Sequence, residues 1–163
     1  MLVRAGIVLL GFLTSTLATA QKATDITPNS IVGIKLGTTQ ARSRTLLAKP
    51  VRLDRLEEGY VRFVSGRQKV EVYFRTGSSG VVAVTTWSKL LRTGKRVGPC
   101  SSIASLQRAY GATLKPFRRG GRVVAYRSGN LIFTVGNRSR VGVVALGRDP
   151  AAVYVALNAP ACS

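Results

Sequence analysis

The sequence has no histidine, two cysteines and six acidic residues among its 163 residues. Without histidine, a Ser-His-Asp triad and a Cys-His pair are both excluded, and imidazole is missing as a metal ligand. The acids and cysteines are scattered along the chain, which leaves little for a carboxylate or thiolate metal site. Even the adjacent Glu57 and Glu58 point apart in an extended segment, so they make a poor acid–base pair. We therefore expect no metal, no cofactor, no small-molecule substrate and no enzymatic activity.

Positive charge is abundant instead. Lysine and arginine total 25, the formal net charge is +19, and arginine outnumbers lysine by 18 to 7. The planar guanidinium suits bidentate binding of carboxylate or phosphate groups. A bias in composition that serves only solubility explains the same excess. The densest basic run predicts a binding loop with four candidate residues: Lys115, Arg118, Arg119 and Arg122.

Residues 1–20 have the pattern of a cleaved signal peptide. Arg4 precedes an apolar run at residues 7–13, and Ala18-Thr19-Ala20 matches an A-x-A cleavage site. A membrane anchor or a buried helix is the alternative, but the run is short for a span and ends in small polar residues. We expect the mature chain to be secreted or extracytoplasmic, in a periplasm or cell-wall space, and not to be an integral membrane protein.

The expected export bears on the two cysteines, because disulfides persist in oxidising compartments outside the cytoplasm. Cys100 and Cys162 are an even pair, which in an oxidising compartment predicts one disulfide that tethers the tail at residues 148–163. A catalytic thiol is the alternative, although no histidine is present to activate it.

The rest of the chain reads as two similar halves, residues 31–88 and residues 93–147, after an extension at residues 21–30. Each half has a helical pattern and then three strand-like runs separated by glycine-containing turns. The helices are expected at 39–48 and 101–110, and the strands at 60–64, 70–75, 81–86, 123–127, 131–135 and 141–146. The predicted fold class is α+β, with tandem duplicated α-βββ units forming an antiparallel sheet packed against helices. Chance similarity between two generic stretches is the alternative, and residues 151–157 fit either a short helix or an extra strand.

Two families share parts of this pattern. Gly37-Thr38-Thr39, followed by Leu47-Ala48-Lys49-Pro50, is similar to the G-x-T and L-G-x-P helix signature of small outer-membrane assembly lipoproteins. The two consecutive helix-then-meander units resemble the tandem architecture of β-lactamase inhibitory proteins. That resemblance implies a sheet whose concave face is presented to a protein target, and it implies architecture rather than target.

Strand periodicity predicts a second group of binding residues. Alternation places aromatic and arginine side chains on one sheet face: Tyr60, Arg62, Tyr73, Arg75 and Arg127. These residue types are enriched in interface hot spots. An ordinary solvated face that carries good strand formers explains the same pattern.

Two functions follow. The first is a secreted, non-enzymatic binding or inhibitor-like module that uses the sheet face and the basic loops to bind an acidic protein partner. The alternative is a basic, envelope-associated protein that adheres to anionic wall polymers or lipid head groups. Nucleic acid is not expected as a partner beyond non-specific contact, because no RNA- or DNA-binding motif is present.

Overall fold

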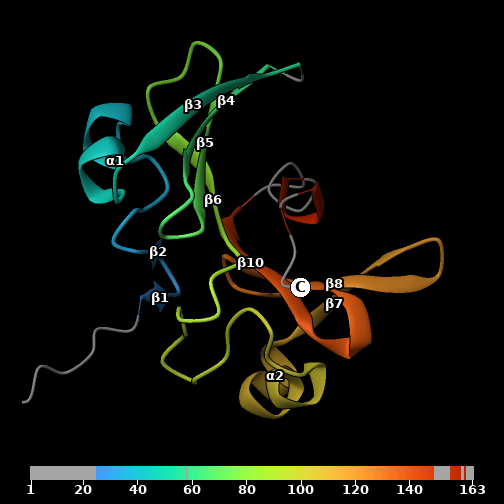
Figure 1. The fold of residues 1–163 in the computed structure, drawn as a ribbon. Coiled ribbons are helices and arrows are strands. Elements are labelled where there is room, and N and C mark those ends of the chain that lie inside the picture. The colour runs from blue at the N-terminus through green and yellow to red at the C-terminus, as the bar shows by residue number, and fades with distance from the viewer. Residues whose placement is uncertain (1–24, 58, 149–154, 159, 161–163) are drawn as a thin grey trace, which may run out of the picture.

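The structure, a computed structural model, describes residues 25–57, 59–148, 155–158 and 160 (Figure 1). Strands dominate it. In chain order the elements are β1 (Ile26–Thr27), β2 (Ser30–Ile31), α1 (Gln40–Leu46), β3 (Val51–Leu56), β4 (Tyr60–Ser65), β5 (Val70–Arg75), β6 (Val81–Thr86), α2 (Ile103–Tyr110), η1 (Gly111–Thr113), β7 (Lys115–Arg119), β8 (Arg122–Ser128), β9 (Leu131–Val135), η2 (Asn137–Ser139) and β10 (Val141–Gly147). Residues 155–158 form a helical turn, called here the C-terminal turn.

One antiparallel sheet contains all strands from β3 to β10, in the order β3-β4-β5-β6-β10-β9-β8-β7. It consists of a first meander, β3 to β6, and a second meander, β7 to β10. The meanders join where β6 pairs with β10, for example at Val84 opposite Leu146. The edge strands β3 and β7 therefore lie at the two far ends of the sheet (Figure 1).

Both α-helices begin at a capping side chain. The Thr39 hydroxyl caps α1 and the Ser102 hydroxyl caps α2, each accepting a hydrogen bond from the backbone N–H three residues later. Helix α2 ends at Tyr110, and Gly111 caps it with a φ of 50°, which costs glycine little. Both expected helices are present, but α1 starts one residue later and ends two residues earlier than the predicted 39–48, and α2 starts two residues later than the predicted 101–110.

One face of the sheet, called here the helix face, carries the main hydrophobic core under α1, α2 and the N-terminal strands β1 and β2. Phe74 and Phe133 are completely buried there. Phe63 meets Phe74 edge-on at 5.1 Å between ring centroids, and Tyr110 of α2 lies 5.1 Å from Phe133. Aromatic pairs of this kind add to the stabilisation from area burial.

The opposite face, called here the tail face, carries a second and smaller cluster. Val155 and Ala156 of the C-terminal turn are buried on it, against residues of five strands: Tyr73, Ala83, Ala125, Ile132 and Ala145. In Figure 1 the turn lies between the β3–β4 hairpin and the β7–β8 hairpin. The chain's own C-terminal turn therefore covers the centre of the tail face.

The predicted fold class is wrong. Instead of tandem α-βββ units packed against helices, the molecule is mostly sheet, with eight strands in one sheet and α-helices of seven and eight residues. The six predicted strands coincide with β4 to β6 and β8 to β10, but β3 and β7 were missed. Both are edge strands, where charge and proline are tolerated. Residues 51–56 are rich in charge, and Pro116 has basic neighbours. For that reason β3 and β7 were not recognised as strands from the sequence.

Some of the predictions from the sequence stay predictions. The signal peptide at residues 1–20 lies outside the described residues, as does Cys162, so the disulfide with Cys100 stays a prediction. The boundaries of the sequence segments at 31–88 and 93–147 also stay predictions. Within the described part of the chain, no helix is both long and apolar enough to cross a membrane.

Candidate functional site

The strand register aligns a row of side chains across the whole tail face. From β3 to β7, direct cross-strand partners form the row Arg52, Val64, Glu71, Thr85, Ala145, Ile132, Arg127 and Lys115. Charged residues stand at both ends, and the positions beneath the C-terminal turn are small or apolar. By alternation from this row, all five predicted sheet-face residues lie on the tail face: Tyr60, Arg62, Tyr73, Arg75 and Arg127.

These five residues do not form one exposed surface. Tyr73 is only 3% exposed, in the cluster under the C-terminal turn. Arg75 is exposed and stands opposite the half-buried Tyr60 at one end of the strand pair. Arg127 is half-buried, and its guanidinium donates hydrogen bonds to two backbone carbonyl oxygens at 2.8 and 2.9 Å. Only Tyr60 and Arg75 thus remain together as an accessible pair.

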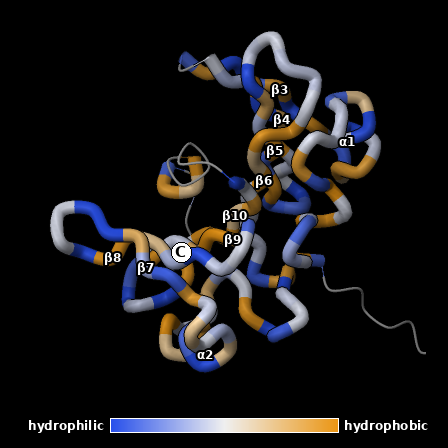
Figure 2. The backbone as a smooth tube through the Cα atoms, turned by 180° about the vertical axis from the view of Figure 1, so that it is seen from behind, coloured by the Kyte–Doolittle hydropathy of each residue, from blue (hydrophilic) through white to orange (hydrophobic). Residues whose placement is uncertain are grey.

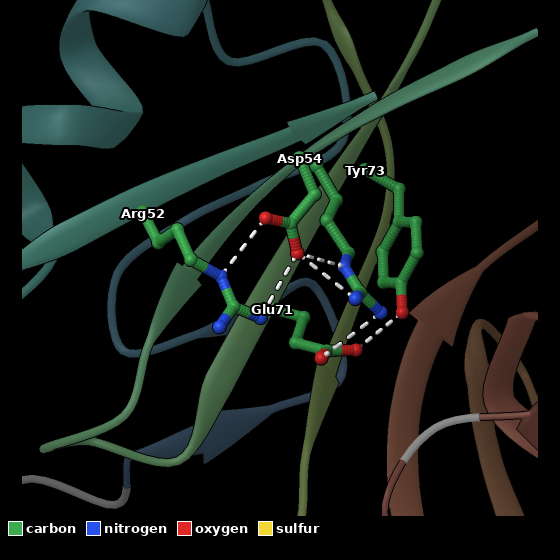
Figure 3. A network of polar contacts seen from close by, with 5 residues as sticks. Arg52, Asp54, Glu71 and Tyr73 are labelled. Atoms are coloured by element: carbon green, nitrogen blue, oxygen red, sulfur yellow. Dashed lines mark hydrogen bonds and ion pairs between the residues drawn. The ribbon is translucent and has the colours of Figure 1, made fainter. Parts of the chain in front are cut away.

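Arg62, the remaining residue of the five, is held in a polar network with Asp54 and Glu71. Figure 3 shows this network, with Arg52, Asp54, Glu71 and Tyr73 labelled. The Nη2 atom of Arg62 lies 2.9 Å from Oδ2 of Asp54, and its Nη1 lies 3.3 Å from Oε1 of Glu71. Arg52 Nε lies 2.8 Å from the other carboxylate oxygen of Asp54. The Tyr73 hydroxyl donates a hydrogen bond to Oε2 of Glu71. Two arginines and two acids thus neutralise one another over three strands.

The pKa shifts in this network follow from burial and pairing. Burial alone would raise the pKa of Asp54, but hydrogen bonds from Arg52 and Arg62 outweigh burial and hold that pKa below its usual 3.8. Burial, and then the hydrogen bond to Glu71, raise the pKa of Tyr73 well above its usual 10.0. At neutral pH Asp54 is therefore ionised and Tyr73 protonated, which are the forms in which their contacts stabilise the sheet.

Reasoning from the sequence selected Arg62 and Tyr73 as contact residues and missed the acids that hold them. A signal was present, because Glu71 is the one acid in the otherwise apolar and aromatic run Val70–Phe74. A lone acid in such a strand is buried only with a partner. Its partner, however, depends on the cross-strand register, which the sequence does not display.

The predicted basic loop is a β-hairpin. Gly120 and Gly121 form its two-residue turn, with φ values of 55° and 75° that glycine adopts readily. Arg119 and Arg122 pair directly on either side of the turn. The four predicted residues of the basic loop lie on the strands β7 and β8 and are all exposed: Lys115, Arg118, Arg119 and Arg122.

The hairpin projects from the body of the molecule, and its end is hydrophilic (Figure 2). Every residue of β7 is exposed, and Phe117 keeps 42% of its surface accessible. Arg118 donates one hydrogen bond, from Nη1 to the Gly121 carbonyl oxygen at 3.1 Å. The hairpin therefore combines four accessible cations with one accessible aromatic ring.

Within the part of the chain that the structure describes, none of these four cations forms an ion pair. Residues 115–147 contain seven basic residues and no acidic residue. Among the residues that the structure describes, the ion pairs all lie in the first meander. Among the described residues, the positive charge of the hairpin therefore has no ion-pair partner, and its side chains face solvent.

A groove of about 900 Å³ lies elsewhere, between α1 and β3. Arg44, Thr45, Lys49, Pro50 and Val51 line it. The Arg44 guanidinium stacks 5.6 Å from the centre of the Phe63 ring, which fixes one of the two cations. The lining has no nucleophile paired with a base, so the groove has no catalytic set.

Within the described ranges, no group of three or more His, Cys, Asp or Glu residues is placed to hold a metal ion. Comparisons with protein-family models, with curated proteins and with solved structures found no match. The resemblance to β-lactamase inhibitory proteins and to outer-membrane assembly lipoproteins gains no support from them and stays a prediction. Among the surfaces that the structure describes, the β7–β8 hairpin, with its accessible cations and aromatic ring, is the strongest candidate site.

Proposed function

We propose that this protein is a non-enzymatic binding module that holds an anionic partner on the β7–β8 hairpin. The observation that carries this proposal is the exposure of Lys115, Arg118, Arg119 and Arg122 in a meander that has no acidic residue. Arginine forks bind carboxylate and phosphate in a bidentate manner, so such groups suit this surface. Export past a membrane, predicted from residues 1–20, is part of the proposal and would place the partner outside the cytoplasm.

The covered tail face favours an anionic polymer or surface over an inhibitor-like mode of binding. An inhibitor-like sheet face would need Tyr73 and the centre of the sheet to be accessible, whereas Tyr73 is 3% exposed. The hairpin, in contrast, needs no rearrangement to meet a partner.

An acidic protein partner is the second candidate. It is favoured by the exposed Arg75 opposite Tyr60 at the end of the β4–β5 pair. Tyrosine and arginine side by side are typical of interface hot spots. Under this candidate, Tyr60→Ala and Arg75→Ala weaken binding, while under the first candidate they leave it unchanged.

The test is charge reversal on the hairpin, with heparin as the probe of polyanion binding. Arg118→Glu with Arg119→Glu should lower affinity by at least tenfold and flatten its dependence on salt, because fewer counterions are released. The matched control is Arg42→Glu with Arg67→Glu, which makes the same change of charge at two exposed arginines of the first half. Equal losses in both double variants would show that net charge, and not the hairpin, governs binding.

A further inference from the structure

The binding of anions by the basic side chains does not explain why the uncharged ring of Phe117 is exposed among them. Phe117 is 42% exposed on an edge strand whose five residues are all exposed. Lys115 lies two residues before it on the same strand face, and Arg118 and Arg119 follow it directly. Binding of a soluble polyanion requires only the cations. An exposed aromatic ring among the cations contributes to binding where the partner presents both anionic and apolar groups.

The hairpin is shaped to reach such a partner. Gly120 and Gly121 at its end have open space around them: a Cβ built on either would meet no atom within 4 Å. The end of the hairpin projects beyond the rest of the sheet in both overall views (Figures 1 and 2). Its end can therefore approach an extended surface before the rest of the molecule does.

The charge distribution would also orient the molecule. Four of the six acidic residues belong to the first meander, at positions 54, 57, 58 and 71, whereas the second meander has none. Edge strands β3 and β7 are the two ends of the sheet. An anionic surface would thus attract the β7 end and leave the acid-containing end turned away.

We infer that the partner of the hairpin is an anionic lipid surface, with Phe117 entering the headgroup region while Lys115, Arg118, Arg119 and Arg122 bind lipid phosphates. This inference rests on the proposed function, because it names the anionic partner of the same hairpin. Each basic residue near an anionic bilayer strengthens binding by about fivefold, and partial burial of the ring adds a comparable factor. The contact is peripheral and requires no spanning segment.

The experiment uses residues 21–163 and four probes: phosphatidylcholine vesicles, vesicles of phosphatidylcholine with phosphatidylglycerol, heparin, and a single-stranded oligonucleotide. The protein should bind the phosphatidylglycerol vesicles and not the neutral ones. Phe117→Ala should lower vesicle affinity by about fivefold and leave heparin affinity unchanged, while Phe117→Leu should retain vesicle binding. Leu90→Ala is the matched control, since Leu90 is 82% exposed outside the hairpin and should not matter.

A second measurement keeps the aromatic ring. In Phe117→Trp with Trp87→Phe, the indole emission should shift to the blue on phosphatidylglycerol vesicles and not on heparin. An unshifted emission, or equal vesicle affinity for Phe117→Ala and wild type, would overturn the inference. Loss of oligonucleotide affinity in Phe117→Ala, with vesicle affinity intact, would overturn it in favour of base stacking. Binding to heparin without binding to vesicles would remove the lipid and keep the proposed function, and failure with all four probes would remove both.

Discussion

The two meanders have four strands each, but they accommodate charge in opposite ways. The first, residues 51–86, has six basic and four acidic residues, and the second, residues 115–147, has seven basic and none acidic. In the first, Arg62 is fixed between Asp54 and Glu71. In the second, the guanidiniums of Arg118, Arg127 and Arg140 donate hydrogen bonds to backbone carbonyl oxygens. An arginine with an acidic neighbour belongs to the fold, and an exposed arginine without one is available to a partner.

The burial of charged side chains also differs between the two meanders. The first meander buries Glu71 to 2% exposure because Arg62 and Tyr73 satisfy it. An unpaired buried charge would shift its pKa or destabilise the fold by several kcal/mol. The second meander lacks such partners, and its strand β7, which carries three basic residues, is exposed along its whole length. Charge pairing thus explains why the first meander can bury a charged side chain.

The largest effect should come from removing Glu71. In Glu71→Ala, Arg62 loses one of its two acids and the Tyr73 hydroxyl loses its acceptor. Breaking a buried pair by deleting one member costs about 3 kcal/mol of unfolding free energy. Chemical denaturation monitored by circular dichroism would measure it. Glu57→Ala is the control, since Glu57 is exposed and should change stability by less than about 0.5 kcal/mol.

A loss of unfolding free energy below about 1 kcal/mol in Glu71→Ala would contradict the difference in charge pairing between the two meanders. It would mean that the network adds little to the fold, and that Arg62 is as available to a partner as the arginines of the hairpin.

Acid should weaken the first meander through Asp54. Its pKa is below the usual 3.8 in the folded protein, because hydrogen bonds from Arg52 and Arg62 outweigh its burial. This contribution to stability is present above the pKa of the unfolded chain and is lost as pH falls through the lower folded pKa. Wild type should therefore lose stability from about pH 4 downward, and Asp54→Asn should lose less there while being less stable at pH 7 by about 1–2 kcal/mol. Thermal unfolding across the acid range measures both, and parallel curves for the two proteins would contradict it.

Periodicity was enough to predict the interior of the sheet and failed at its edges. Runs such as Val70–Arg75 alternate or are uniformly apolar because they are buried on one or both faces, and that pattern is visible in the chain. The edge strands β3 and β7 are partly or wholly exposed, so no burial pattern marks them. Pro116 is compatible with β7 because an edge strand need not donate every backbone hydrogen bond.

The candidate site was predictable in the same uneven way. Exposed cations at Arg118 and Arg119 could be expected from sequence, because consecutive arginines without acids nearby have little chance of burial. The burial of Tyr73 was not predictable, because it depends on contact with Val155 across more than eighty positions of sequence. Alternation places a residue on a face, and only the tertiary fold shows what covers that face.

The smallest expected effect on stability comes from placing an acidic residue in the second meander, which has none. Lys115 stands directly opposite Arg127, so two positive charges are paired across β7 and β8. Like charges in this arrangement are mildly destabilising, whereas opposite charges stabilise by a few tenths of a kcal/mol. Lys115→Glu should therefore raise stability by about 0.5 kcal/mol and at the same time weaken heparin binding by about fivefold or more. Lys115→Gln separates the two contributions, since it removes the repulsion without adding an ion pair.

Opposite signs for stability and binding would show that the hairpin keeps its positive charge for a partner at the expense of the fold. A parallel loss of both would mean that Lys115 stabilises the hairpin itself, and the two meanders would then differ less than their charges indicate.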